Sequence, residues 1–70
     1  MKASDIVIGG LYRHFKGGLY RVYGFAKHTE TEESLVLYRE EGAEGMFWCR
    51  PVKMFCEMVG PIQRFEKVPE

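Results

Sequence analysis

Glycine-containing turns at short intervals divide this chain into segments that are too short for long helices. The turns fall at Gly9-Gly10, Gly17-Gly18, Gly42, Gly45 and Gly60-Pro61. The tripeptide Lys16-Gly17-Gly18 is typical of a hairpin turn, because glycine tolerates the positive φ that tight hairpins require. Short runs of residues between such turns predict a small all-β domain.

The segments between these turns alternate side chains with the period of a strand. The expected strands cover residues 11–15, 19–29, 35–40 and 46–50, and the closing strand or strands cover 57–59 and 62–65. Gly24 lies inside the longest of these segments, where a glycine predicts a bulge or a sharp bend. The chain from residue 66 onward is expected to be a loose tail.

A single helical turn is expected just before the closing strand. Pro51 has the fixed φ of a first helical residue. A turn this short cannot cover a sheet face, so the sheet must curl on itself. We therefore predict an all-β fold, a small SH3-like barrel of about five strands with one short helical turn near residues 51–56. The alternative is a split sheet packed by one longer helix over residues 51–59, which Gly60-Pro61 would end.

Length and charge limit the classes of function. Seventy residues are enough for one domain, covering residues 1–70. Ten Lys and Arg balance ten Asp and Glu, which argues against duplex DNA as a partner because such proteins carry a basic excess. No run reaches the roughly 18 apolar residues of a membrane span, and the first residues lack the apolar core of a signal peptide. With only two cysteines, the sequence predicts a cytoplasmic protein without a membrane partner.

One eleven-residue stretch, from Tyr12 to Val22, is distinctive and reads YRHFKGGLYRV. It is followed in order by Ala26, His28-Thr29-Glu30-Thr31, Glu33, Val36, Tyr38-Arg39, Trp48, Arg50-Pro51 and Met54-Phe55. This pattern resembles the small, mostly bacterial domain-of-unknown-function family numbered 1653, over residues 10 to about 58. The resemblance implies a cytoplasmic all-β domain with no established activity. Cys49 and Cys56 do not belong to the pattern, which argues against a cysteine-based function.

Basic and aromatic residues are concentrated in these same blocks. If the first two predicted strands form a hairpin, Tyr12, His14 and Tyr20 should cluster, and Trp48 and Arg50 could extend the group. Aromatic rings and Arg planes of this kind stack on nucleotides. We therefore interpret the protein as a binding module for a nucleotide-like or single-stranded RNA ligand. The predicted binding residues are Arg13, His14, His28, Glu30, Tyr38, Trp48 and Arg50.

Two other classes of function stay open. The two faces of the central strands are both apolar, so one face should stay partly exposed and contact a protein partner or a second copy. The face in question carries Leu19, Tyr23, Phe25, Leu35 and Leu37, opposite Val22 and Val36. The third interpretation is a small enzyme that uses His28 with Glu30, two residues apart, as an acid–base pair.

Metal and cofactor sites are not predicted. The spacing of His14, His28, Cys49 and Cys56 does not match a zinc motif. Lys16-Gly17-Gly18 lacks the pattern of a phosphate-binding loop and does not lead into a helix. No catalytic residue is therefore assigned from the sequence.

Overall fold

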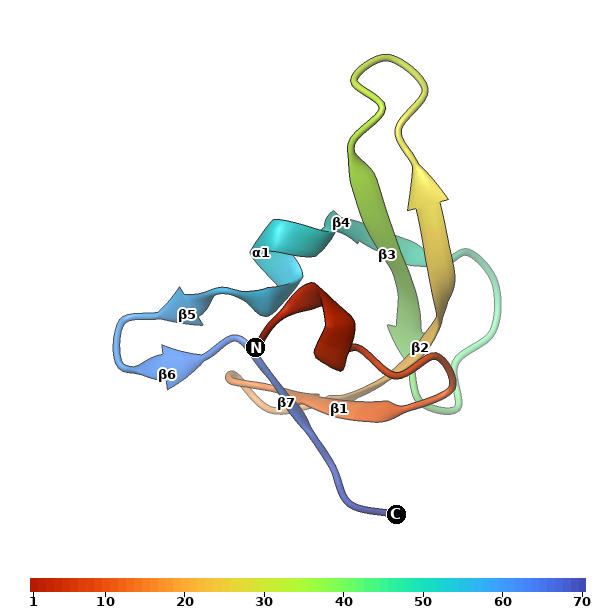
Figure 1. The fold of residues 1–70 in the computed structure, drawn as a ribbon. Coiled ribbons are helices and arrows are strands. Elements are labelled where there is room, and N and C mark those ends of the chain that lie inside the picture. Colours follow the sequence, from red (N-terminus) through yellow and green to blue (C-terminus); the bar gives the residue numbers. More distant parts are fainter.

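A curled antiparallel sheet forms most of the molecule (Figure 1). The computed structural model describes residues 1–70. Its elements are η1 (Ala3–Asp5), β1 (Leu11–His14), β2 (Leu19–Lys27), β3 (Ser34–Glu40), β4 (Trp48–Pro51), α1 (Val52–Cys56), β5 (Met58–Val59), β6 (Ile62–Gln63) and β7 (Phe65–Lys67). Five strands pair in the order β4-β3-β2-β1-β7, and β5 and β6 form a separate small hairpin.

The all-β prediction and the short helical turn are confirmed. Helix α1 ends at Cys56 because Glu57 is extended and its N–H bonds back to the Met54 carbonyl. The alternative of a longer helix through residue 59 is therefore wrong. The strand expected to begin at residue 46 begins at Trp48 instead. None of the helices is long and apolar enough to span a membrane.

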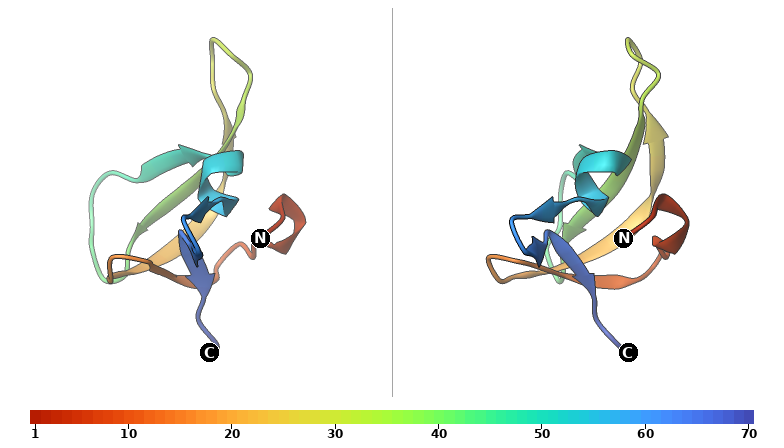
Figure 2. Two further views of the ribbon diagram at one scale, coloured as in Figure 1. Left: turned by 90° about the vertical axis from the view of Figure 1, so that its left-hand side faces the viewer. Right: turned by 60° about the vertical axis from the view of Figure 1, so that its left-hand side comes forward.

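The sheet curls but does not close. Figure 2 shows β2 bending, so that β1 runs across the direction of the upper part of β2 and β3. Strands β4 and β7 are the two edges of the sheet, and they do not pair with each other. Helix α1 packs near this opening, against β3 and β4. The structure is thus a half-open curled sheet, and a closed barrel is not formed.

The predicted hairpin at Lys16-Gly17-Gly18 is present. Gly17 and Gly18 both have positive φ, at 96° and 81°. The N–H of His14 donates to the Gly18 carbonyl at 3.1 Å, and the Gly17 N–H donates to the His14 carbonyl at 2.8 Å. The turn therefore fixes the register in which Tyr12 faces Tyr20.

The bulge predicted at Gly24 is also present, and it changes which side chains share a face. Val22 lies opposite Tyr38, but beyond the bulge Phe25 lies opposite Val36. Residues opposite each other in a sheet point to the same face. Phe25 is therefore on the face of Val36, and the prediction that it lies on the opposite face together with Tyr23 is wrong. The extra residue of the bulge reverses the alternation that the sequence pattern assumes.

The core lies on the concave face of the sheet, under α1. Its seven buried residues are Ile6, Tyr12, Val22, Val36, Tyr38, Phe55 and Phe65. Phe55 of α1 stacks on Phe65 of β7, with ring centroids 4.2 Å apart and planes 8° from parallel. The fully buried Tyr12 satisfies its hydroxyl by accepting the Val7 N–H at 2.9 Å. The short helix α1 is thus enough to cover the core, because its Phe55 side chain fills the space inside the curled sheet.

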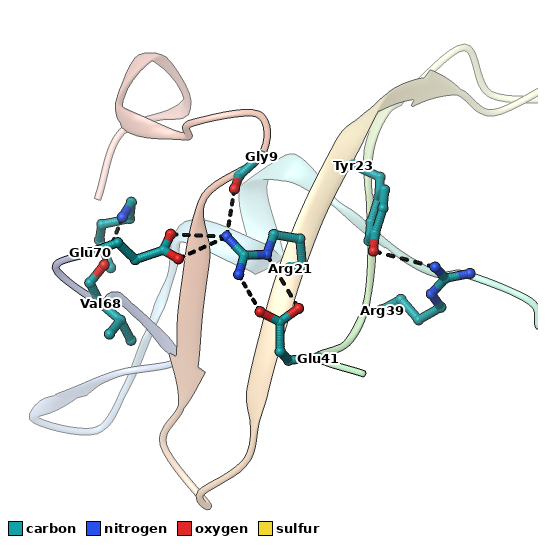
Figure 3. Close-up of polar contacts among 8 residues, drawn as sticks. Gly9, Arg21, Tyr23, Arg39, Glu41, Val68 and Glu70 are labelled. Atoms are coloured by element: carbon teal, nitrogen blue, oxygen red, sulfur yellow. Dashed lines mark hydrogen bonds and ion pairs between the residues drawn. The ribbon is translucent and has the colours of Figure 1, made fainter. Parts of the chain in front are cut away.

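Both ends of the chain are attached to the sheet. The expectation of a loose tail from residue 66 is wrong, because β7 pairs with β1 and the Val68 N–H donates to the Leu11 carbonyl at 2.9 Å. Arg21 of β2 holds three segments together, as Figure 3 shows. Its guanidinium donates to the Gly9 carbonyl at 2.9 Å, to the Glu70 carboxylate at 2.9 and 3.1 Å, and to the Glu41 carboxylate.

Candidate functional site

A hollow of about 270 Å³ opens on the concave face, between the two edges of the sheet. Every strand of the main sheet contributes to its wall. The six lining residues are His14 of β1, Tyr20 of β2, Tyr38 of β3, Trp48 and Arg50 of β4, and Phe65 of β7. Residues far apart in the sequence meet here because the sheet curls enough to bring β4 toward β1 and β7.

Strand register explains why these side chains share the hollow. Tyr38 lies opposite Trp48, and His14 lies opposite Phe65. Within β4, Trp48 and Arg50 are two residues apart and therefore point to the same face. The grouping of His14 and Tyr20 with Trp48 and Arg50 that alternation predicts is thus present in the structure.

Arg50 is the central cation of the hollow. Its Nε donates to the Tyr38 hydroxyl at 3.1 Å, and its guanidinium carbon lies 5.9 Å from the centre of the Phe65 ring. The ion pairs of the structure join Arg21 to Glu41 and Glu70, and Arg64 to Glu57. Arg50 takes part in none of them, so its positive charge has no carboxylate partner and its two terminal nitrogens remain available.

His14 lines the hollow beside Arg50 in a defined orientation. Its Nδ1 accepts the Lys16 N–H at 3.2 Å, which leaves Nε2 as the nitrogen that carries the proton of the neutral ring. Its ring meets Tyr20 and Phe65 edge to face, at centroid distances of 6.2 and 4.9 Å. Burial lowers the pKa of His14 from its ordinary value of 6.5, and the positive charges of Arg50, Arg64 and Lys16 lower it further.

Trp48 forms the exposed rim of the hollow. Its side chain is 65% exposed, whereas Phe65 and Tyr38 at the back of the hollow are buried. An indole that is this exposed beside a cation offers a flat apolar surface to a ligand ring. The hollow therefore combines a charged group, several hydrogen-bond donors and one open aromatic face.

Three of the predicted binding residues lie outside the hollow. Arg13 is exposed on β1 between Tyr12 and His14, so it points to the opposite face of the strand. His28 and Glu30 are exposed at the tip of the β2–β3 hairpin. The Nδ1 of His28 there accepts the N–H of Glu30 at 3.1 Å, so the ring caps a turn through the backbone of Glu30.

Tyr20 and Phe65 line the hollow although the sequence did not assign them to the site. The alternation of side chains along the predicted hairpin placed Tyr20 on the same face as His14. That shared face was the sequence feature that could have assigned Tyr20 to the site. Phe65 had no such signal, because its strand was expected to end at residue 65 and its pairing with β1 depends on tertiary structure. The structure contains no cluster of three or more His, Cys, Asp or Glu side chains suited to a metal ion.

A second hollow, of about 380 Å³, lies under the β3–β4 loop and is lined in part by Arg39, Met46 and Phe47. Arg39 packs against two rings that also contact each other, with its guanidinium carbon 4.9 Å from the Tyr23 centroid and 4.7 Å from the Phe47 centroid. It also donates to the Tyr23 hydroxyl at 3.3 Å (Figure 3). Part of the aromatic surface predicted for self-association is thus occupied by the protein's own arginine. Self-association stays a prediction, which sedimentation equilibrium would contradict by giving a monomer at high concentration.

Comparison with known proteins identifies the family. The family model described as "protein of unknown function (DUF1653)" matches residues 10–67, a longer region than the residues 10 to about 58 that the sequence pattern covers. The crystal structure of a DUF1653 protein from Bordetella bronchiseptica is similar to this chain at 32% sequence identity and a TM-score of 0.78. The similarity covers 99% of this chain and 100% of that one. No curated protein matches. The chain therefore belongs to the DUF1653 family, whose function is unknown.

Proposed function

We propose that this domain is a binding module that takes a nucleotide-like anion in the hollow between β4, β1 and β7. The ligand has an anionic group, which pairs with Arg50, and a flat ring, which stacks on Trp48. A free nucleotide and one nucleotide of a single-stranded RNA share this chemistry. The two free thiols, Cys49 and Cys56, fit the reducing cytoplasm as the location of such a module.

The state of Arg50 is the observation that carries the proposal. A partly buried guanidinium in a folded protein is normally paired with a carboxylate, because removing a charge from water is costly. The only side-chain hydrogen bond of Arg50 goes from its Nε to the Tyr38 hydroxyl, and its other contact is with the uncharged Phe65 ring. Its terminal nitrogens form the planar fork that matches a phosphate or a carboxylate with two parallel hydrogen bonds.

The size of the hollow limits the ligand. Ligand pockets commonly measure about 300–1,000 Å³, and this one measures about 270 Å³. It therefore suits a single nucleotide better than a track of several stacked bases. An RNA would insert one nucleotide here and leave the remainder outside the hollow.

A titration followed by amide NMR tests the proposal. Adenosine 5′-monophosphate, a short single-stranded RNA and adenosine are added separately to the protein at low salt. Binding in the hollow shifts the amides of His14, Trp48 and Arg50. We expect Arg50→Gln to weaken binding of adenosine 5′-monophosphate at least about tenfold, the factor given by loss of one charge-assisted hydrogen bond.

Arg13→Gln is the matched control, because it removes the same charge from the opposite face of the sheet. It should leave the affinity within a factor of two, and both variants should melt near the wild-type temperature. Equal losses of affinity in Arg50→Gln and Arg13→Gln would mean that binding depends only on the net charge of the protein. Shifts confined to residues outside the hollow, or no shifts with any of the three compounds, would overturn the proposed site.

A further inference from the structure

The polar groups that meet in the hollow are hydrogen-bond donors that lack acceptors within the protein. Arg50 has two free terminal nitrogens, since only its Nε is engaged. The Tyr38 oxygen accepts that bond, so the proton of its own hydroxyl is free to be donated. His14 presents Nε2–H because Nδ1 accepts the Lys16 N–H. Donors from β1, β3 and β4 thus line one small volume.

The charges around this volume are positive and only partly compensated. Arg50, Arg64 and Lys16 all act on the His14 ring. Arg64 is neutralised by Glu57 at 3.1 Å, whereas neither Arg50 nor Lys16 has a carboxylate partner among the ion pairs. The remaining groups against the ring are the aromatic side chains of Tyr20, Phe15 and Phe65. Arg50 is therefore the uncompensated cation of the lining itself, and Lys16 adds a second positive charge that acts on the His14 ring from outside the lining.

We propose that the hollow recognises a terminal phosphomonoester, with its oxygens accepting from Arg50, the Tyr38 hydroxyl and the Nε2–H of a neutral His14. This inference rests on the proposed function and narrows it. A phosphomonoester is close to a dianion at pH 7 and has three acceptor oxygens. A phosphodiester inside an RNA chain has one charge and two free oxygens, so it leaves donors and charge in the hollow unmatched.

His14 acts in this proposal as a neutral donor whose orientation is fixed. Protonation of Nδ1 would remove the acceptor of the Lys16 N–H and add a third positive charge beside Arg50 and Lys16. The burial and the nearby cations that lower the pKa of His14 favour the same neutral form. His14 therefore remains a neutral hydrogen-bond donor throughout the neutral pH range. The pH dependence of binding then comes from the phosphate group of the ligand.

The test compares adenosine 5′-monophosphate with adenosine 3′,5′-cyclic monophosphate and with adenosine, by calorimetry between pH 5.5 and 8. The linear monophosphate should bind about tenfold more tightly than the cyclic diester at pH 7.5, the factor expected from one additional charge-assisted hydrogen bond. Its affinity should fall as pH drops below about 6, where the second phosphate proton is taken up. The affinity of the cyclic compound should change little over this range.

Substitutions at His14 test its part. His14→Phe keeps the ring contacts with Tyr20 and Phe65 but removes the donor, and should reduce the preference for the linear monophosphate about tenfold. His14→Gln keeps an N–H near the position of Nε2 and should restore part of the preference. His28→Phe, at the tip of the hairpin, is the matched control and should change nothing.

The outcomes separate this inference from the proposed function. Equal binding of the linear and cyclic compounds leaves the nucleotide site in place and overturns the phosphomonoester. An affinity for the linear compound that rises as pH falls overturns the neutral donor, because it would mean that His14 binds as a cation. If none of the three compounds binds in the hollow, the proposed function fails and the inference fails with it. Should His14→Phe not fold, the pH profile of the wild-type protein still decides.

Discussion

Hydrogen bonds to the backbone hold the side chains of Tyr12 and His14 in one orientation each. Tyr12 is fully buried, and its hydroxyl holds the N-terminal segment through the Val7 N–H. His14 is held through the Lys16 N–H. Sequence alternation predicts which face such a residue occupies, but it does not show which backbone group the side chain will meet. The direction in which His14 presents Nε2 therefore became known only from the structure.

We expect the stability of the protein to depend on His14 in mildly acidic solution. Since the pKa of His14 is lower in the folded protein than its ordinary value of 6.5, the unfolded chain binds more protons between the two values. The contribution of His14 to the free energy of unfolding should therefore be constant above about pH 6.5. It should decrease as the pH drops from 6.5 toward the lower pKa of the folded state. Urea denaturation at a series of pH values measures it.

His14→Phe should remove this part of the pH dependence, whereas His28→Phe should retain it. A wild-type curve that stays flat as the pH falls below 6.5, or one that rises toward lower pH, would contradict the neutral His14 of the folded state.

Among the elements, the hairpins decide which side chains come together. The turn at Gly17 and Gly18 sets the register of β1 against β2, and the bulge between Val22 and Gly24 shifts β3 against β2. Both features were predicted from glycines in the sequence, but Gly17 and Gly24 differ in backbone conformation. Gly17 has a φ of 96°, whereas Gly24 is not in the positive-φ region and has open space where a Cβ would stand.

Alanine substitutions should separate the two glycines. Gly17→Ala places a side chain in the left-handed region, and it should lower the free energy of unfolding by about 1–2 kcal/mol. Gly24→Ala meets no neighbour and restricts the unfolded chain, so it should leave stability within about 0.5 kcal/mol or raise it slightly. Denaturant midpoints of the two variants provide the measurement. A larger loss at Gly24 than at Gly17 would mean that the bulge, and not the turn, needs its glycine.

At the scale of the whole molecule, contacts made by Arg21 connect the ends of the chain to the sheet. Its guanidinium joins the loop at Gly9, the C-terminal Glu70 and the β3–β4 turn at Glu41 (Figure 3). Hydrogen bonding to Arg21 lowers the pKa of Glu41, and the two carboxylates raise that of Arg21. This cluster lies at the surface, where ion pairs contribute little to overall stability. Its effect is therefore expected to be local.

Arg21→Ala should release the C-terminal segment while the rest of the sheet stays folded. The Val68 N–H, which donates to the Leu11 carbonyl at 2.9 Å, should exchange with deuterium severalfold faster than in the wild type, because local opening costs less. Amides in the centre of β3 should exchange at wild-type rates. Lys27→Ala removes an exposed charge from the end of the same strand and serves as the control. Faster exchange throughout the sheet would show that Arg21 supports the global fold.

The sequence alone determined the local features of this protein. Glycine turns, strand alternation and the proline before α1 each act over a few residues, so they predicted the all-β class, the first hairpin, the bulge and the helical turn. The same alternation grouped His14 and Tyr20 with Trp48 and Arg50. The clear pattern around residues 12–22 also placed the chain in its family.

Tertiary structure alone decided how far the sheet curls and which edges stay open. That outcome depends on Phe55 packing against Phe65 and on β7 pairing with β1, which are contacts between residues distant in the sequence. It also placed His28 and Glu30 outside the hollow, at the tip of the β2–β3 hairpin, whereas strand alternation already puts Arg13 on the face opposite His14. The lack of a carboxylate partner for Arg50 was also decided by the tertiary structure, because only the folded chain shows which charged side chains form ion pairs.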